Sequence, residues 1–327
     1  MSAAGRQRGV ALILALLVMA LAVAAVAAMT ARQQFDIRRT ANLLAEDQAY
    51  LYALAVETWG ERILQRDRRQ GDVDDLRENW ARLPPPIQVE GGTISGHIED
   101  LQGRFNLNDL LVNGAPSAPD VARFQRLLQL LDIDPQHVQA VLDWLDPDQQ
   151  ARFPGGAEDE YYLGLTPPYR AADRTMVSPS ELLLVAGFTP KMYARLAPYV
   201  TALPTRTPVN VDTAPAPVLA MLVPGLSADD AKALVRARNA QPYQSPDDFL
   251  NQPAVQVWLE RDPGLAAALR QGISVSSDYF MIHAAVRIAR ARVFLNSLVH
   301  REARGETVIM RTRGAPTGPI SPGGGTS

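Results

Sequence analysis

The chain has 327 residues, of which 47% are hydrophobic and 20% are charged, and its formal net charge is −3. This balance argues against a general polyanion-binding protein, which would carry an excess of positive charge. The sequence contains no cysteine, which excludes disulfide bonds and thiol chemistry. The length allows two folded modules in addition to a membrane segment.

The first part of the chain predicts a helix that crosses a membrane. A short basic segment with Arg6 and Arg8 precedes residues 10–29, which are all apolar. At about 1.5 Å per residue, this run is as long as the roughly 30 Å hydrocarbon core of a bilayer. Because basic residues mark the cytoplasmic side of a span, we expect a single-pass protein whose bulk lies on the far side.

The helix is expected to continue beyond the membrane. No Gly or Pro interrupts residues 30–35, and apolar residues then recur at helical spacing as far as Ile63. A secretory signal peptide has a shorter apolar stretch, which ends in small residues at a cleavage site. A plain membrane anchor on a soluble domain remains an alternative at this point.

Strand patterns flank the middle of the chain. Residues 93–99 alternate like a half-buried strand, and residues 279–288 and 291–299 are two further strand runs. Arg304, Gly305 and Glu306 lie between the last of these and residues 307–310 (TVIM), which suggests a hairpin. From residue 106 to residue 270 the pattern is one of short helices separated by turns. We therefore predict an α+β fold interrupted by an all-α insertion.

The helical block contains an internal repeat. Residues 105–108 (FNLN) resemble residues 209–212 (VNVD), and each unit later contains a Ser-Pro pair, at Ser178 and at Ser245. Serine at the N-cap, proline at the first helical position and an acidic residue at the third satisfy the free amides of a first turn. We therefore expect a helix to begin after each serine.

The first unit differs from the second by a long acidic insertion, which is the best candidate site. Six acidic residues lie between Asp143 and Glu160, with Arg152 as the single base. Converging carboxylates suit Ca²⁺, which takes six to eight oxygen ligands and tolerates irregular loops, whereas zinc prefers His or Cys. The spacing is not that of an EF-hand, and a merely solvated acidic loop remains the alternative. The candidate metal ligands are Asp143, Asp146, Asp148, Glu158, Asp159 and Asp173.

The second unit invites a rival interpretation. Residues 222–226 (LVPGL), together with the helical pattern that follows, resemble a helix-hairpin-helix, a motif that binds nucleic-acid phosphates. Residues 209–255 contain five acidic and three basic residues, however, and phosphate binding favours the reverse balance. A membrane-anchored DNA-binding protein is therefore the second hypothesis, and no nucleic-acid partner is expected.

The sequence gives no support to catalysis. The four histidines are scattered over different elements, and neither H-E-x-x-H, G-x-S-x-G nor a P-loop is present. Asp143 and Asp146 form a conceivable acid/base pair, but no nucleophile accompanies them. We expect that the protein is not an enzyme.

The N-terminus resembles a type IV prepilin leader. Arg8 and Gly9 are followed by the apolar run VALIL. This resemblance implies that a prepilin peptidase cuts between Gly9 and Val10, that Val10 is then N-methylated, and that the uncut apolar segment remains as a stem. Most pilins carry a Glu at the fifth position after the cut, where this chain has Leu14.

The missing Glu, the paired helical units and the WLDPD…GAEDEYY stretch make the chain similar to the minor pseudopilin K family of type II secretion. In that family the helical units are SAM-like and the acidic loop binds calcium. A divergent minor pilin of a type IV pilus is a further alternative. The expected division is leader 1–9, transmembrane stem 10–29, pilin-like helix and first strands 30–105, all-α insertion 106–270 with units 106–200 and 209–255, pilin-like strands 271–313, and disordered tail 314–327.

The resemblance also implies a function and partners. A member of this family caps the tip of the pseudopilus and promotes its assembly for protein export across the outer membrane. The implied partners are the minor pseudopilins I and J, with H below them, and the prepilin peptidase. The implied location is the inner membrane of a Gram-negative cell, with the bulk of the chain in the periplasm.

Overall fold

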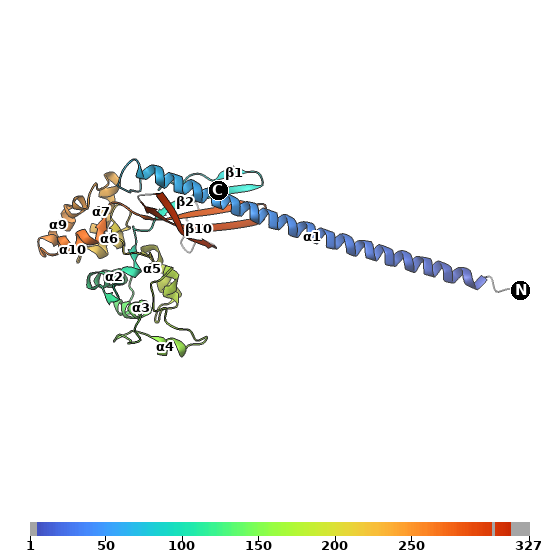
Figure 1. Cartoon of the computed structure of the whole chain (residues 1–327), viewed down its shortest axis with the longest axis horizontal. Helices are drawn as coiled ribbons and strands as arrows, with labels where there is room; N and C mark the ends of the chain where they lie inside the picture. The colour runs from blue at the N-terminus through green and yellow to red at the C-terminus, as the bar shows by residue number, and fades with distance from the viewer. Residues whose placement is uncertain (1–4, 303–304, 315–327) are drawn as a thin grey trace.

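A computed structural model describes residues 5–302 and 305–314, with the backbone alone for residues 5–9. The chain begins with a single helix, α1 (Gly5–Arg68), which is 64 residues long. Its N-terminal half projects as a stem, whereas its C-terminal half packs on the rest of the protein (Figure 1). Among the described residues, α1 is the one helix long and apolar enough to cross a membrane. The predicted continuous helix is confirmed.

The second element is a five-stranded antiparallel sheet with the strand order β1-β2-β9-β10-β11. Strands β2 and β9 come from distant parts of the sequence, yet they pair along their whole length, from Gly92 opposite Ile288 to Asp100 opposite Phe280. We call the sheet, the helices between β2 and β9, and the part of α1 packed on them the head. The strands are β1 (Ile87–Val89), β2 (Gly92–Asp100), β9 (Tyr279–Ile288), β10 (Ala291–Glu302) and β11 (Gly305–Arg313).

Small residues let α1 lie close to the sheet. Ala49 and Ala53 are fully buried against the sheet. At Gly60 an added Cβ would stand 2.7 Å from the Cδ1 atom of Ile282, so only glycine fits there without a shift. Alternate residues of β9 point toward α1 and are buried, as the period of two in the sequence predicts. The predicted α+β class is therefore confirmed.

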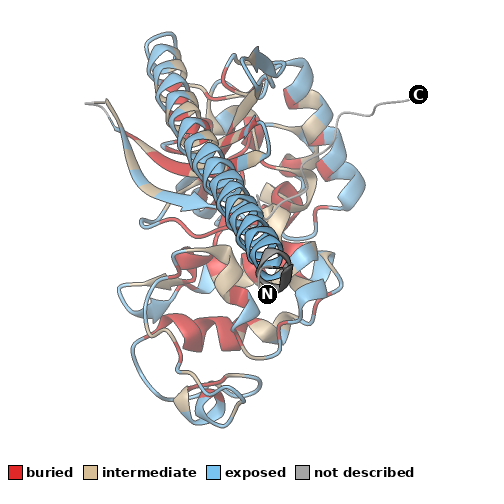
Figure 2. Cartoon of the chain, turned by 90° about the vertical axis from the view of Figure 1, so that its right-hand side faces the viewer, coloured by how far each residue is buried: buried red, intermediate tan, exposed pale blue. Residues whose placement is uncertain are grey.

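A block of short helices separates β2 from β9 and lies beside the sheet (Figures 1 and 2). Its α-helices are α2 (Ala118–Leu130), α3 (Val138–Leu145), α4 (Asp159–Leu163), α5 (Pro190–Leu196), α6 (Ala216–Leu222), α7 (Ala228–Ala240), α8 (Pro246–Leu250), α9 (Pro253–Leu259) and α10 (Leu265–Gly272). Four short 3₁₀ helices complete it: η1 (Leu107–Leu110), η2 (Pro135–His137), η3 (Pro179–Leu183) and η4 (Ala197–Tyr199).

The block is not wholly helical, which corrects the expectation of an all-α insertion. It contains short strand pairs, because the ends of each unit need partners for buried backbone groups. In parallel pairs, the first strand of a unit lies beside a strand at its end. The pairs are β3 (Phe105–Asn106) with β6 (Val200–Thr201), β7 (Val209–Asn210) with β8 (Ile273–Ser274), and the antiparallel β4 (Leu111–Val112) with β5 (Ala115–Pro116).

The two units share one hydrogen-bonded frame. In the first unit the side-chain oxygen of Asn108 accepts a hydrogen bond of 2.8 Å from the Met176 amide. In the second unit a carboxylate oxygen of Asp212 accepts one of 3.0 Å from the Tyr243 amide. Both acceptors belong to the repeated sequence, and both donors lie two residues before the Ser-Pro pair.

The Ser-Pro helix starts are present as the sequence predicts. Ser178 and Ser245 each form a reciprocal capping box with the acidic residue three positions later, Glu181 and Asp248. The helix that follows Ser178 is a short 3₁₀ helix, whereas an α-helix follows Ser245. The predicted disordered tail from residue 314 falls, apart from Gly314, outside the described residues, as do the first four residues of the leader.

A buried polar network joins α1, the sheet and the second helical unit. Arg301 on β10 is only 3% exposed and forms ion pairs with Asp67 at 3.3 Å and with Asp74 at 2.5 Å. Asp74 also accepts a hydrogen bond from the Ser277 amide. The Ser277 hydroxyl donates in turn to Asp100, at 2.7 Å.

The same carboxylate of Asp100 accepts a hydrogen bond of 3.1 Å from Asn210, which belongs to the repeated sequence of the second unit. Burial raises the pKa of Asp100 to about 6. Burial, followed by the negative charges of Glu78 and Asp74, raises the pKa of Asp67 to about 7, and Arg301 offsets this only in part. The network therefore holds two aspartates whose pKa values lie well above the usual value for aspartate.

The raised pKa of Asp67 predicts a pH-dependent stability. An unfolded aspartate titrates near pH 4, so between about pH 4 and pH 7 the folded state binds more protons, and the free energy of unfolding falls as the pH rises. We expect Asp67→Asn to remove this pH dependence. Between pH 5 and pH 8 the free energy of unfolding of the variant should rise relative to that of the wild type by about 2 kcal/mol. Urea unfolding in detergent micelles, followed by tryptophan fluorescence, measures it. Asp72→Asn, at an exposed surface ion pair, is the control and should keep the wild-type slope.

Candidate metal site

The acidic loop lies between α3 and α4, at the end of the helical block that is farthest from α1 (Figure 1). Asp146 is the C-cap of α3, and Glu158 is the N-cap of α4. Both are buried, with 1% and 4% of their surface exposed. The two carboxylates, one from each end of the loop, are thus buried together because they cap two successive helices.

An aromatic cluster supports the loop from below. The Trp144 indole packs edge-to-face on the Tyr162 ring, with 5.3 Å between the centroids. Tyr162 is fully buried, and its hydroxyl accepts a hydrogen bond of 3.1 Å from the Ala186 amide. These two aromatic residues therefore pack against the base of the loop. Tyr161 contacts the Tyr162 ring but is half exposed.

Three carboxylates converge, and most of their buried oxygens have no hydrogen-bond donor. Asp146, Asp148 and Glu158 place oxygen atoms within 4.8 Å of one another. Both carboxylate oxygens of Glu158 are buried without a hydrogen-bond partner, and so is one oxygen of Asp173. The carboxylate of Asp146 contacts the Arg152 guanidinium as an ion pair, but neither of its oxygens has a hydrogen bond of good geometry.

These carboxylates repel one another within the loop. Burial, with the negative charges of Asp143 and Asp146, raises the pKa of Glu158 to about 8. Burial also raises the pKa of Asp146 and that of Asp173. A buried ionised carboxylate is costly unless it is paired, and here Arg152 pairs with Asp143 and Asp146, whereas the oxygens of Glu158 have no partner. A hard divalent cation would satisfy the unpaired oxygens, so the donor set fits calcium.

The other two predicted ligands hold the loop in place. Asp143 is fully buried, and it accepts hydrogen bonds from the Arg152 amide at 3.0 Å and from the Arg152 guanidinium at 2.5 Å. Asp159 accepts from the Ala171 amide at 3.0 Å and pairs with Arg170 at 3.1 Å. The structure thus brings Asp146, Asp148 and Glu158 together. It gives Asp143 and Asp159 other partners.

A second acidic group was not foreseen from the sequence. Asp67, Asp74 and Glu78 also place carboxylate oxygens within 4.8 Å of one another. Their oxygens already have partners, however, because Arg301 pairs with both aspartates and the Trp80 indole donates to Glu78 at 2.8 Å. This group therefore belongs to the structural network described above. Its members lie on α1 and the loop after it, where spacing alone gave no signal.

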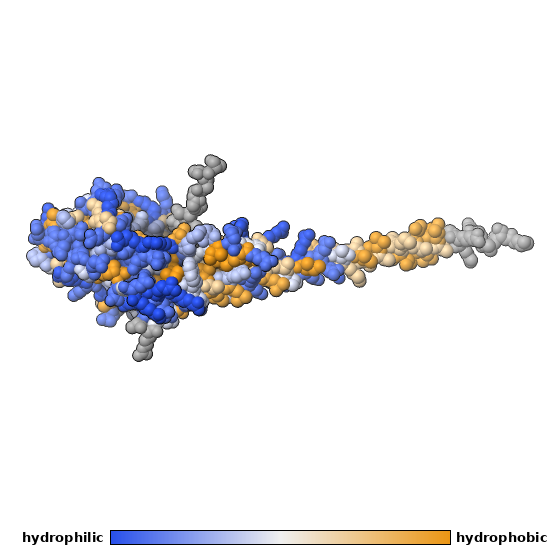
Figure 3. Space-filling view, turned by 90° about the horizontal axis from the view of Figure 1, so that it is seen from above, coloured by the Kyte–Doolittle hydropathy of each residue, from blue (hydrophilic) through white to orange (hydrophobic). Residues whose placement is uncertain are grey.

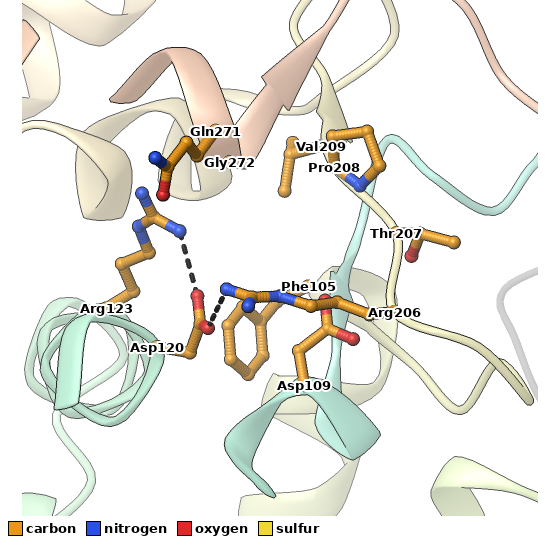
Figure 4. A pocket seen from close by; sticks show the side chains of 10 residues that line it. All are labelled: Phe105, Asp109, Asp120, Arg123, Arg206, Thr207, Pro208, Val209, Gln271 and Gly272. Carbon is orange, nitrogen blue, oxygen red and sulfur yellow. Dashed lines mark hydrogen bonds and ion pairs between the residues drawn. The ribbon is translucent and has the colours of Figure 1, made fainter. Parts of the chain in front are cut away.

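A cavity of about 190 Å³ lies where the two helical units meet (Figure 4). Asp120 extends into it and accepts hydrogen bonds of 2.8 Å from Arg123 and 2.8 Å from Arg206. Nearby Asp109 has its pKa raised to about 7 by burial and by the charge of Asp120. The ion pairs of Asp120 thus lie at the junction of the two helical units, and their role is structural.

The helix-hairpin-helix pattern corresponds to α6 and α7, joined by a turn at Gly225 with φ of +84°. The Trp258 ring lies against this glycine, where a Cβ would stand 2.2 Å from the ring. Lys232, one of the three bases of the unit, is paired with Asp229 at 3.0 Å. The Trp258 ring therefore covers part of the turn, and the nearby Lys232 is already paired with a carboxylate.

The predicted processing site lies within α1. The backbone of Gly9 and Val10 is helical and continuous with the stem, and the Val10 side chain is exposed. Leu14 is also exposed on the stem, at 55%. Cleavage and methylation remain predictions.

Comparisons with known proteins agree with one another. Two family models, both described as type II secretion system protein K, match residues 103–205 and 209–274. The junction between the two matches falls between β6 and β7, where one helical unit ends and the next begins.

Similar curated proteins carry the same description. The type II secretion system protein K of Pseudomonas aeruginosa is 38% identical over 98% of this chain and 96% of its own length. The protein K of Klebsiella pneumoniae is 37% identical over 94% of this chain and 97% of its own length. A solved structure, that of the GspK–GspI–GspJ complex from the type 2 secretion system of enterotoxigenic Escherichia coli, contains a chain with a TM-score of 0.76. That chain is 26% identical, and the match covers 85% of this chain and all of that one.

Because the oxygens of Glu158 have no hydrogen-bond partner, replacing this residue should have opposite effects on stability in the absence and in the presence of calcium. In a chelator, we expect Glu158→Gln to stabilise the chain, because it removes a buried carboxylate without a partner. In calcium, the wild type should gain about 2.7 kcal/mol when the free ion is a hundredfold above Kd, and the variant should gain little. Unfolding curves in chelator, calcium and magnesium measure this. Asp247→Ala, on the second unit, should respond to calcium as the wild type does. Identical wild-type curves in chelator and calcium would show that the loop binds no calcium.

Proposed function

We propose that this chain, which belongs to the protein K family of the type II secretion system, is a minor pseudopilin that assembles through α1 and caps the pseudopilus. The family is a structural component of the secretion machinery rather than an enzyme family. The observation that carries the proposal is an exposed apolar stripe on α1, beyond the predicted membrane span.

The stripe consists of Ile37, Leu44, Leu51, Ala55 and Trp59. The first three recur every seven residues and are 60%, 64% and 65% exposed. Ala55 and Trp59 continue the same face at intervals of four residues, and both are exposed. The opposite face of α1 is the one that packs on the sheet. A heptad spacing of apolar residues is the pattern by which one helix packs along another.

The stripe extends the apolar surface of the stem into water. Figure 3 shows apolar side chains over the outer stem and again where the stem meets the head. An exposed apolar patch on a soluble segment marks a contact site. Beside Trp59 it leads into a largely apolar groove between α1 and β2, which includes Ile63, Trp80 and Pro84. The stripe therefore suits the apolar helices of neighbouring subunits.

The partners follow from the family. The related GspK chain was solved in complex with GspI and GspJ. We infer that pseudopilins I and J pack on the stripe of this chain and that H lies below them. The prepilin peptidase would cleave after Gly9, and the chain would cross the inner membrane once, with its head in the periplasm.

Two features support a position at the tip. Leu14 provides no carboxylate for the amine of a subunit above it, and a buried carboxylate in an apolar stem is costly without a partner. The helical block makes the head extend to one side of α1 (Figure 1), which favours one copy at an end over regular repetition. The same features separate this chain from an ordinary filament subunit.

Calcium would have a structural role in this protein. Asp146, Asp148 and Glu158, with Asp173 beside them, would hold the ion and so fix the loop between α3 and α4. The ion would remove the repulsion among the buried carboxylates and leave the surface of the first helical unit in one shape.

Processing predicts a mature N-terminus at residue 10. Gly9→Val should leave a full-length precursor in the membrane that does not enter the pseudopilus, because the peptidase needs a small residue before the cut. Intact-mass spectrometry of the wild type and the variant, isolated from a host with the peptidase, measures the N-terminus. A functional wild type that begins near residue 30, or that keeps Met1, would contradict the pseudopilin assignment.

The stripe predicts that acidic substitutions on this face of α1 weaken the binding of pseudopilins I and J. Leu44→Asp with Leu51→Asp should lower the amount of pseudopilins I and J that co-purifies with the chain at least about tenfold, because a carboxylate buried in an apolar contact costs more than 1.4 kcal/mol. The matched control is Leu183→Asp with Leu184→Asp, two exposed leucines at the last position of η3 and at its C-cap. Equal recovery of I and J with both double variants would show that the stripe is not the assembly surface.

A further inference from the structure

The end of the sheet nearer the membrane carries unpaired positive charge. The β9–β10 hairpin turns at Ala289 and Arg290, and Arg287 and Arg292 flank the turn. All three arginines are exposed. Arg313, at the end of β11, is a fourth exposed arginine and lies over the Tyr50 ring of α1, at 3.8 Å. We call these four residues the basic end of the sheet.

Nothing in the described chain neutralises the basic end. None of its four arginines forms an ion pair with a described acidic residue, whereas Arg311, two residues before Arg313, pairs with Glu57 at 2.7 Å. Arg287 and Arg292 also lie directly opposite one another in the antiparallel ladder. Like charges at directly opposed positions destabilise a sheet, so an external anion would stabilise this arrangement.

The carboxylates at the same level of the head do not compensate for it. Glu90 lies in the β1–β2 turn, where Gly91 accepts a hydrogen bond of 2.8 Å from the Ala289 amide. Glu46 and Asp47 lie on α1, and all three acids are exposed. In the described residues no ion pair joins any of these acids to the basic end. Four arginines thus face solvent in a chain whose net charge is −3.

The position of the basic end identifies the kind of anion it meets. Ile288 and Val293 of the hairpin share a buried cluster with Ala45 of α1. Ala45 lies 16 residues after Met29, the last residue of the apolar run, which is about 24 Å along the helix. Lipid headgroups reach only about 5–8 Å beyond the hydrocarbon, and the remaining gap exceeds the Debye length of about 8 Å. A lipid phosphate is therefore out of reach when the stem is upright.

We propose that the basic end of the sheet docks on an acidic surface of a neighbouring pseudopilin head, the one that lies next to the stem on the membrane side. This rests on the proposed function, because the stripe on α1 aligns neighbouring stems and so places a second head below the overhanging sheet. The stripe supplies the apolar contact between helices. The basic end supplies the charge that selects which head lies beneath.

The test uses the full chain in inner membranes with co-expressed pseudopilins H, I and J. The native sequence has no cysteine, so Ala291→Cys, within the hairpin, gives a single attachment point for a thiol-linked photo-crosslinker. We expect an adduct with one of the three pseudopilins. Its yield should fall at least about fivefold in 1 M salt, where the Debye length is about 3 Å.

Charge reversal separates docking from folding. Arg290→Glu with Arg292→Glu should lower the adduct yield by the same factor and leave co-purification of I and J through the stripe intact. The unfolding midpoint should not decrease, because Glu at position 292 would face Arg287 across the ladder. The matched control, Lys191→Glu with Arg236→Glu, makes an equal charge change at exposed bases of the helical block and should keep the wild-type yield.

Three results would overturn the proposal: adducts with lipid alone, adducts with none of the three pseudopilins, or an undiminished yield after charge reversal. Failure of the proposed function would look different, because the wild-type chain would then fail to co-purify with I and J.

Discussion

The buried arginine Arg301 is the interaction on which the arrangement of the whole head depends. It lies on β10, pairs with Asp67 near the end of α1, and pairs with Asp74 on the following loop. Through Ser277 and Asp100 the same network reaches the second helical unit. A buried charge that loses its partner costs several kcal/mol, so these segments have no freedom to separate. The direction of the stem relative to the head is set here.

That rigid junction gives α1 two distinct surfaces. One face uses small residues, such as Ala53 and Gly60, to lie close to the sheet, and the opposite face keeps leucines in solvent. If the head could rotate about α1, a stripe at a fixed angle would not present a defined surface to a neighbour. The network therefore fixes the direction in which the stripe faces, as the proposed assembly through α1 requires.

The two helical units show how one frame supports two roles. Each begins with a short strand and holds its Ser-Pro helix start by an Asn or Asp side chain, Asn108 or Asp212. The second unit contacts the network through Asn210 and is tied to the sheet. The first unit lies farther from it and carries the acidic loop, where the buried carboxylate oxygens of Glu158 have no hydrogen-bond partner, which costs stability. The frame tolerates the insertion because the hydrogen bond that defines it, from the Met176 amide to Asn108, lies outside the acidic loop.

The sequence by itself determined the features that have a local period or a local cap. These are the long helix, the strand at residues 279–288 with its hairpin neighbours, the helix starts at Ser178 and Ser245, and the acidic loop as the place to look for a metal. Tertiary structure decided which residues meet across the chain. The short parallel strands, the network around Arg301 and the separation of Glu158 from Asp159 depend on contacts between distant segments. Glu158 and Asp159 are neighbours in the sequence, yet their side chains point in different directions and meet different partners. Packing, and not sequence spacing, sets these directions.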